Sequence, residues 1–393
     1  MAIREQVYGY FIPSVTLIGI GAAKQIPEKM KALGGTKPLI VTDKGITAAG
    51  ITKQITDLLD EAGMKYVIYD ETIPNPTDKN VQAGVDVYKK ENCDSLITLG
   101  GGSSHDCGKG IGLVIANGGK IHDYEGVDMS TKPMPPYLAV NTTAGTASEM
   151  TRFCIITDTS RHVKMAIVDW RVTPGIAVDD PLLMVGMPPA LTAATGMDAL
   201  THAIEAYVST IANPMTDSAA EKAIELIAKH LRPAVANGQD LDAREGMCFA
   251  QYLGGMAFNN ASLGHVHAMA HQLGGFYDLP HGECNAILLP HVEKYNLIAK
   301  IDRFVKIAEL LGENTKGLAP RDAAELALVG IRKLSADVGI PSGLIELGKR
   351  YGKEVKASDI DTMVANAQKD ACGLTNPRCP KDADVKAIFL AAL

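Results

Sequence analysis

The sequence has no apolar run long enough to cross a membrane. Its hydrophobic stretches fall well short of the ~18 residues that a membrane-spanning helix needs. Residues 1–6 also contain nothing like the apolar core of a secretory signal peptide. We therefore expect a protein without a membrane partner that stays in the cytoplasm.

Basic runs are missing too. The chain contains 38 Lys and Arg residues against 45 Asp and Glu residues, which gives a net charge of -7. Proteins that bind nucleic acid usually carry a surplus of basic residues gathered on one face. We expect no nucleic-acid partner.

Closely spaced cysteine pairs are absent as well. The chain has seven cysteines, and no two of them form a Cys-x-x-Cys pair. An odd number without such pairs argues against a disulfide framework and against a zinc site built from thiolates. We expect most of these cysteines to be buried free thiols.

The sequence does contain a clear change of texture near its middle. The 393 residues exceed what a single core usually holds, about 250–300 residues, so two domains are expected. In the first part, β-branched runs at 38–42, 65–69, 95–99 and 137–140 alternate with helical stretches, including 51–62 and 81–91. This alternation predicts βαβ units and a parallel sheet.

The second part has Ala-rich helical patterns instead. They cover 192–210, 217–230, 243–259 and 322–338. Pro181 and Pro188-Pro189 lie where the texture changes. We predict an NAD-binding α/β domain over 1–185 and an all-helical metal-binding domain over 186–393.

A glycine-rich turn in the first part is suited to a dinucleotide. Gly100, Gly101, Gly102 and Ser103 follow a predicted strand, at a point where a helix can begin. Glycine allows the backbone to approach a pyrophosphate, and the free N–H groups of a helix start favour its negative charge. The earlier Gly19-Ile20-Gly21 segment only partly matches a dinucleotide fingerprint, because Lys24 replaces its last glycine, and we interpret it as a turn.

Two further segments support this interpretation. Asp43 follows the 38–42 strand, where a carboxylate can accept both ribose hydroxyls and repel a 2′-phosphate, so NAD is favoured over NADP. The segment 141–146 follows another strand and carries hydroxyl groups and a glycine that could hydrogen-bond the cofactor.

Histidine is concentrated in the second part. Of ten histidines, four fall within seventeen residues, namely His265, His267, His271 and His281. Asp198 and His202 are four residues apart, which places both on one face of a helix. Imidazoles with a carboxylate suit a divalent ion such as Fe(II) or Zn(II). Spacing alone does not select which three histidines bind it.

At this point the chain resembles a known family, the iron-containing (group III) alcohol dehydrogenases, over essentially its full length. The resemblance rests most specifically on residues 190–198 and 267–281, and also on residues 11–13, 141–146 and the Gly100–Ser103 turn with Asp106 and Lys109. Within the family, the chain looks most like the branch of NAD-dependent methanol and 1,3-propanediol dehydrogenases.

The resemblance implies a site for each cofactor. A divalent metal would be bound by Asp198, His202, His267 and His281, and Fe(II) is the preferred ion, with Zn(II) or another ion as the alternative. The NAD contacts would be Asp43, Asn75, Gly101, Gly102, Ser103, Thr142, Thr143, Thr146 and Lys164. It also implies a Rossmann-like N-terminal domain followed by an all-helical one, in a dehydroquinate synthase-like architecture. The resemblance further implies a homo-oligomer, either a dimer or a larger assembly. His265 departs from the family pattern and is either a residue supporting the site or a helix-surface residue.

These observations predict an NAD-dependent oxidation of small primary alcohols, from methanol to butanol and 1,3-propanediol, and the reverse aldehyde reduction. The residues that we expect to carry the reaction are Asp198 and His267 at the metal and His271, which would pass the hydroxyl proton toward solvent. A glycerol-type dehydrogenase and an NAD- and metal-dependent lyase of the dehydroquinate synthase type are the alternatives. A closed structural metal site is a third.

Overall fold

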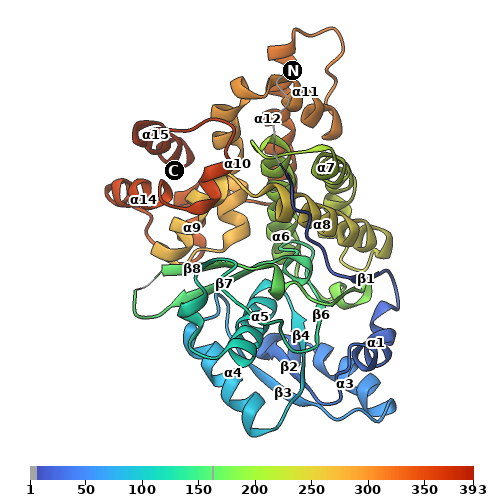
Figure 1. The fold of residues 1–393 in the computed structure, drawn as a ribbon. Coiled ribbons are helices and arrows are strands. Elements are labelled where there is room, and N and C mark those ends of the chain that lie inside the picture. The colour runs from blue at the N-terminus through green and yellow to red at the C-terminus, as the bar shows by residue number, and fades with distance from the viewer. Residues whose placement is uncertain (1–6, 162) are drawn as a thin grey trace.

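The computed structural model describes residues 7–161 and 163–393. The stretch in which we expect no signal peptide, 1–6, lies outside the described residues. The sheet and the helices that cover it form one half of the molecule, and a group of helices forms the other half (Figure 1). None of the described helices is long and apolar enough to span a membrane.

The first half is built on a six-stranded parallel sheet. Neighbouring strands follow the order β1 (Val15–Ile18), β9 (Ile176–Asp179), β6 (Tyr137–Asn141), β4 (Ser95–Gly100), β2 (Pro38–Asp43) and β3 (Val67–Thr72). The predicted parallel sheet is confirmed. The third strand begins two residues later than the 65–69 run suggested, because Lys65 and Tyr66 precede the pairing with β2.

Helices cover both faces of this sheet. Alternate side chains of a strand point to opposite faces. Ile40 packs with the core formed by α1 (Ile26–Ala32) and α3 (Ile51–Glu61). Its neighbours Leu39 and Val41 pack with the core formed by α4 (Asp78–Lys90) and α5 (Gly102–Asn117). The inner strands β2, β4 and β6 are therefore buried on both sides, as their continuous apolar runs require.

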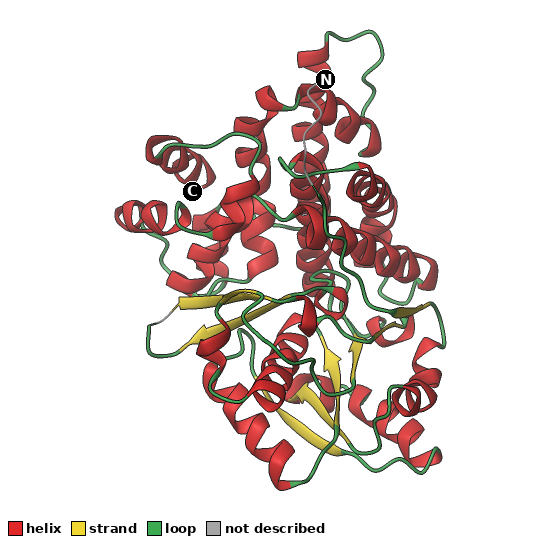
Figure 2. Cartoon of the chain, in the orientation of Figure 1, coloured by secondary structure: helices red, strands yellow, loops and turns green. Residues whose placement is uncertain are grey.

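A second, smaller sheet was not predicted. It consists of β5 (Gly126–Val127), β8 (Val163–Val168) and β7 (Phe153–Asp158), with β7 and β8 antiparallel. Figure 2 shows these strands where the α/β half meets the helical half. Lys109 of α5 is fully buried and donates hydrogen bonds to the carbonyls of Ser148 (2.6 Å) and Phe153 (2.7 Å), which fixes the start of β7.

The second half is helical, as predicted. Its helices are α6 (Pro189–Val208), α7 (Pro214–Ala236), α8 (Leu241–Ala261), α9 (His265–Tyr277), α10 (His281–Asn296), α11 (Ile301–Leu310), α12 (Pro320–Asp337), α13 (Leu344–Arg350), α14 (Ile360–Ala367) and α15 (Asp382–Ala392). The last strand of the large sheet ends at Asp179 and α6 begins at Pro189, on either side of the boundary that we predict at residue 185.

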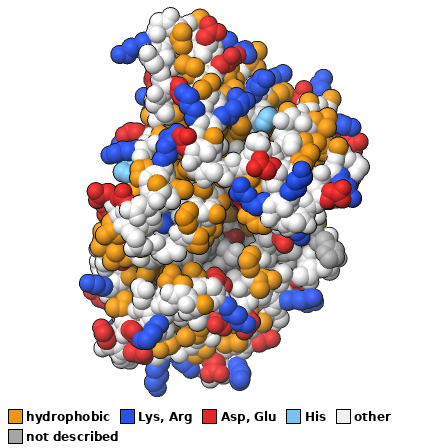
Figure 3. All heavy atoms as spheres, turned by 180° about the vertical axis from the view of Figure 1, so that it is seen from behind, with side chains coloured by type: hydrophobic (Ala, Val, Ile, Leu, Met, Phe, Trp, Pro, Cys, Tyr) orange, Lys and Arg blue, Asp and Glu red, His pale blue; other side chains and the backbone are white. Residues whose placement is uncertain are grey.

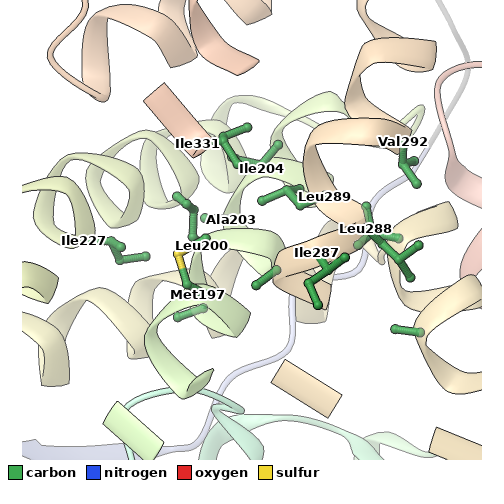
Figure 4. Close-up of a cluster of buried hydrophobic side chains, with 14 of the residues drawn as sticks. Met197, Leu200, Ala203, Ile204, Ile227, Ile287, Leu288, Leu289, Val292 and Ile331 are labelled. Carbon is green, nitrogen blue, oxygen red and sulfur yellow. The ribbon is translucent and has the colours of Figure 1, made fainter. Parts of the chain in front are cut away.

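The core of this half holds α6 and α10 together. Leu200 and Ile204 of α6 lie in one apolar cluster with Leu288 and Leu289 of α10 and with Ile331 of α12 (Figure 4). Apolar residues on α6 alternate with the polar ones considered below, so the helix is buried nearly all round. Close packing of this kind fixes the positions of the side chains that these helices carry.

The seven cysteines are free thiols, and five of them are buried.

Seen from behind, the surface is hollowed where the two halves meet, and basic side chains are interspersed with acidic ones (Figure 3).

Candidate active site

Helix α6 places three polar side chains on one face. Asp198, His202 and Glu205 are separated by four and three residues, which corresponds to successive helical turns. All three are buried in the apolar core, with exposed fractions of 3%, 5% and 1%. Buried polar groups need partners, so neighbouring helices must supply them.

Two of those helices begin with histidines. His267 lies in the first turn of α9, and His281 is the first residue of α10, after Pro280. The Nε2 atoms of His202, His267 and His281 lie 3.9, 3.8 and 3.7 Å from the same atom, Oδ1 of Asp198. Four residues that the sequence singled out are therefore brought together around one carboxylate oxygen.

Burial favours the neutral form of these imidazoles. It lowers the pKa of His202 and of His267 to about 4. Desolvation also lowers the pKa of His281 well below its ordinary value, and the positive charges of Lys164 and of the neighbouring imidazoles when protonated act in the same direction. Neutral imidazoles present the free lone pairs that a divalent cation requires.

Asn285 lies among the same four residues, and the sequence analysis missed it. Its amide nitrogen donates to Oδ1 of Asp198 at 2.7 Å and also lies 3.0 Å from Nε2 of His281 and 3.1 Å from Nε2 of His267. Three potential ligand atoms thus converge on one point. That convergence is what a cation-binding site of imidazole and carboxylate ligands requires.

Glu205 was missed as well. Its Oε2 accepts a hydrogen bond from Nδ1 of His267 at 2.5 Å, and its Oε1 accepts one from the backbone N–H of Val266 at 2.7 Å. The helical spacing to Asp198 and His202 was visible in the sequence. Its partner, His267, lies 62 residues away, and the contact between them could not be seen in the sequence.

His271 stands beside this cluster and has a different partner. Its ring stacks on that of His281, with 5.4 Å between centroids, and its Nδ1 lies 2.8 Å from Oδ2 of Asp370. Asp370 immediately precedes the turn η8 (Ala371–Thr375) near the C-terminus, and the sequence analysis did not single it out. Although burial acts to raise the pKa of Asp370, the charge and hydrogen bond of His271 lower it to about 2.

His265 is not a helix-surface residue, so that alternative was wrong. Its side chain is buried at the start of α9 and lies against Gly373 of η8. The run of residues before α9 turns inward because Gly264 and His265 pack against Glu205 and Asn376. His265 therefore lies in the interior behind the metal-ligand candidates.

On the α/β side, the glycine-rich turn is the start of α5. Gly101 is its N-cap and Gly102 its first residue. A Cβ atom placed on Gly101 would lie 3.0 Å from Thr143, and one placed on Gly102 would lie 3.0 Å from Thr146. The structure therefore brings the two predicted NAD-binding segments side by side. Ser103 lies in the same first turn, and Thr142 donates its backbone N–H to the carbonyl of Gly100.

Asp43 also reaches this turn. It ends β2 and accepts the backbone N–H of Ile46 at 2.9 Å, which caps α2 (Lys44–Ala48). Gly100 has a φ of +146°, and a Cβ atom on it would lie 3.7 Å from Oδ2 of Asp43. The carboxylate thus lies at the carboxyl edge of the sheet, where parallel α/β sheets bind ligands. The Gly19–Gly21 segment forms a turn against Asp180, as interpreted from the sequence.

Asn75 and Lys164 lie between the two halves. Nζ of Lys164 donates to Oδ1 of Asn75 at 2.8 Å, and the amide of Asn75 lies 3.4 Å from Oδ1 of Asp278, just after α9. Burial lowers the pKa of Lys164. These two cofactor candidates therefore border the helices that carry the histidines.

Comparison with known proteins agrees with this arrangement. A family model described as "Iron-containing alcohol dehydrogenase" matches residues 13–181, and one described as "Fe-containing alcohol dehydrogenase family, C-terminal" matches residues 192–393. The chain belongs to the iron-containing alcohol dehydrogenase family. It is therefore a metal-containing alcohol dehydrogenase, and the resemblance inferred from the sequence is confirmed.

Its relatives in this family include several with known names. The chain is 53% identical to the 1,3-propanediol dehydrogenase of Citrobacter freundii, over 98% of this chain and 99% of that protein. It is 49% identical to the NAD-dependent methanol dehydrogenase of Bacillus methanolicus, with the same coverage. A solved structure of 1,3-propanediol oxidoreductase superimposes with a TM-score of 0.96 at 52% identity, over 99% of this chain and 100% of that chain.

The family uses NAD and a divalent metal, and the residues present fit both. The Nε2 atoms of His202, His267 and His281 all face Oδ1 of Asp198, and three imidazoles with one carboxylate are a donor set that suits a divalent metal. At the other end, Gly101 and Gly102 lie at the start of α5, where free backbone N–H groups suit a pyrophosphate, and a Cβ atom on either would press against Thr143 or Thr146.

Proposed function

We propose that the chain oxidises small primary alcohols, from methanol to butanol and including 1,3-propanediol, to aldehydes with NAD, and also catalyses the reverse reduction. The observation that carries this proposal is the convergence of His202, His267 and His281 on Asp198, beside Lys164 and Asn75. Relatives named for 1,3-propanediol and methanol support the substrate class.

In this proposal, Asp198, His202, His267 and His281 hold the divalent metal, with Fe(II) in the first place and Zn(II) also compatible with the donors. When bound, the metal supplies a Lewis acid for the alcohol oxygen, and NAD supplies the hydride acceptor. The chain's own part is to orient these groups and to handle the proton.

The proton is assigned to His271. Its Nδ1 is occupied by Asp370, so Nε2 is the nitrogen left to take the hydroxyl proton and release it toward solvent. An imidazole whose other nitrogen is held by a carboxylate keeps one tautomer, which prepares it for a single direction of proton transfer.

Aromatic side chains form an apolar wall beside the histidines. The ring of Phe258 stacks on His202 with centroids 4.3 Å apart, and Phe153 lies 5.8 Å from Phe258. This wall limits the entry of water on that side, which strengthens the electrostatic interactions within the site.

NAD is assigned to the turn at the start of α5 and the loop after β6. Gly101, Gly102 and Ser103 would receive the pyrophosphate, and Thr142, Thr143 and Thr146 would border it. Asp43 would accept the ribose hydroxyls. Asn75 and Lys164 would contact the part of the cofactor nearest the metal, since Asn75 contacts Asp278, just after α9, and Lys164 donates to Asn75.

We also propose that the protein acts in the cytoplasm as a homo-oligomer, a dimer or larger. Light scattering of the purified protein measures the mass of the assembly, and a mass equal to that of one chain would contradict the proposed oligomer. Residues 1–185 and 186–393 are proposed as the two domains.

The experiment that tests the function follows NADH formation by absorbance. Metal-stripped protein is given Fe(II), Zn(II), Mg(II) or Mn(II), with methanol, ethanol, propanol, butanol, 1,3-propanediol or glycerol. We expect one ion to restore turnover on the primary alcohols, and His267→Ala to abolish it. Tight NAD binding without turnover on any alcohol would contradict the proposal and favour the lyase alternative, which regenerates its NAD.

A further inference from the structure

Glu205 is a buried carboxylate with two uses. It projects from α6, one turn after His202, and its exposed fraction is 1%. One oxygen accepts the N–H of His267 Nδ1 at 2.5 Å, and the other accepts the backbone N–H of Val266 at 2.7 Å. It therefore connects the helix that carries two of the proposed ligands to the helix that carries a third.

The bond to Nδ1 determines what Nε2 of His267 can do. A neutral imidazole carries one proton, so holding it on Nδ1 leaves a lone pair on Nε2. That Nε2 lies 3.8 Å from Oδ1 of Asp198 and 3.1 Å from the amide nitrogen of Asn285. Histidines that bind metals commonly donate their other ring N–H to a carboxylate, which fixes tautomer and ring orientation.

The surroundings of Glu205 are shaped for this carboxylate. It lies at the N-terminus of α9, where free backbone N–H groups and the helix dipole favour a negative charge. A Cβ atom on Gly264 would lie 2.7 Å from Oε1 of Glu205, so only glycine leaves room for the carboxylate there. Val266 and Gly264 thus hold Glu205, and Glu205 holds His267.

We propose that Glu205 is a positioning residue of the metal site: it fixes the tautomer and ring orientation of His267 and joins α6 to α9 at the proposed ligands. This inference rests on the proposed function, because it takes His267 to be a ligand. Glu205 itself contacts neither substrate nor cofactor.

The test measures metal affinity in metal-stripped protein, by competition with a chelator for Co(II) and Zn(II). Glu205→Gln keeps the shape, but its amide can satisfy only one of the two N–H groups, and Glu205→Ala satisfies neither. We expect metal affinity to fall about 10- to 100-fold. The visible absorption of the Co(II)-substituted protein should also change, since it reports ligand geometry. Unchanged affinity and unchanged Co(II) absorption in both variants would overturn the proposal.

Glu293→Gln is the matched control. Glu293 is also a fully buried glutamate of the helical half, and its Oε2 accepts a hydrogen bond from Asn296 rather than from a histidine. This variant should bind metal like the parent. An equal loss of affinity in Glu293→Gln would mean that any buried glutamate has this effect, and would likewise overturn the proposal.

Two further variants keep the outcome clear. Asp198→Ala and His281→Ala should abolish metal binding; if they do not, the proposed metal site fails, whatever Glu205 does. If both Glu205 variants fail to fold, Glu205→Asp keeps the carboxylate on a side chain shorter by one methylene. With unfolding temperature and NAD binding in the metal-free state near the parent's, weakened metal binding by Glu205→Asp supports the proposal, and unchanged binding overturns it.

Discussion

The two histidines His267 and His271 differ in the carboxylate that their Nδ1 atom contacts. His267 and His271 are one helical turn apart on α9, yet one bonds Glu205 from the interior and the other bonds Asp370 from the C-terminal segment. The side chain of His267 is 2% exposed, whereas that of His271 is 20% exposed. The two imidazoles of α9 are thus held by different carboxylates, one in the interior and one in the C-terminal segment.

This difference leads to a prediction for His271. Replacing it by Ala should lower kcat about 100-fold, the usual contribution of a positioned proton-transfer group. Metal content, measured by elemental analysis, should stay unchanged. Asp370→Asn should cause a smaller loss, because its amide oxygen can still accept from Nδ1 without supplying a charge. Loss of metal from His271→Ala would make His271 a ligand instead.

Asp43 gives a second prediction at this scale. Asp43→Asn keeps an oxygen that can cap α2 at Ile46, but it removes the charge that would repel a 2′-phosphate. The preference for NAD over NADP, measured as the ratio of kcat/KM values, should fall about tenfold, or ~1.4 kcal/mol. The unfolding temperature should match the parent's. An unchanged ratio would place the ribose elsewhere.

Several residues of the candidate site could be predicted from the sequence, because local spacing identifies them. The four-residue interval between Asp198 and His202 is a property of one helix, and the glycine turn is a property of one strand–helix junction. Glu205 and Asp370 could not be predicted in this way, since their partners lie 62 and 99 residues distant. Only packing of α6 and η8 against α9 creates those pairs.

Whole elements follow the same rule. Strands β2, β4 and β6 were predictable because each is a short apolar run between turns and is buried on both faces. Strands β1 and β9 of the same sheet were not predicted. The hairpin of β7 and β8 was not predictable in this way. The burial of its residues alternates along each strand, and no Asn-Gly or Asp-Gly turn joins the two strands. The position of this hairpin depends on contacts with distant residues, such as the hydrogen bond from Lys109 to the carbonyl of Phe153.

Helix α10 carries a buried acid with a consequence for stability. Burial, with the charge of Glu205 as a second cause, raises the pKa of Glu293 from 4.5 to about 8. The folded protein therefore keeps a proton that the unfolded chain releases near pH 4.5. The stability from this group is complete below pH 4.5 and is lost progressively as the pH rises toward 8.

Glu293→Gln should remove that loss, because the amide has the shape of the protonated acid. Relative to the parent, the variant's free energy of unfolding should rise between pH 5 and pH 8, by up to about 1.4 kcal/mol per pH unit. Denaturant unfolding at a series of pH values measures this. Glu225→Gln, at a surface pair with Lys222, should run parallel to the parent. If Glu293→Gln does so too, Glu293 is ionised in the folded protein.

At the scale of the whole molecule, the two halves meet through buried polar contacts as well as apolar ones. Gln251 of α8 donates its amide to Oε1 of Glu149 at 2.9 Å and to Oδ1 of Asp179, at the end of β9, at 3.1 Å. Burial raises the pKa of Glu149 to about 7 and that of Asp179 well above its usual range. One helical side chain thus holds two acids of the α/β half at the carboxyl edge of its sheet.

Gln251→Ala should therefore weaken the join between the halves. It removes a donor shared by two fully buried acceptors, and a buried acceptor without its partner costs about 1–3 kcal/mol. We expect a lower unfolding temperature in calorimetry, whereas the metal content of the folded protein should stay unchanged, because no proposed ligand contacts Gln251. Gln272→Ala is the control, since the side chain of Gln272 bonds only the Ala268 carbonyl of its own helix. Equal unfolding temperatures for Gln251→Ala and Gln272→Ala would mean that the hydrogen bonds of Gln251 do not help to join the two halves.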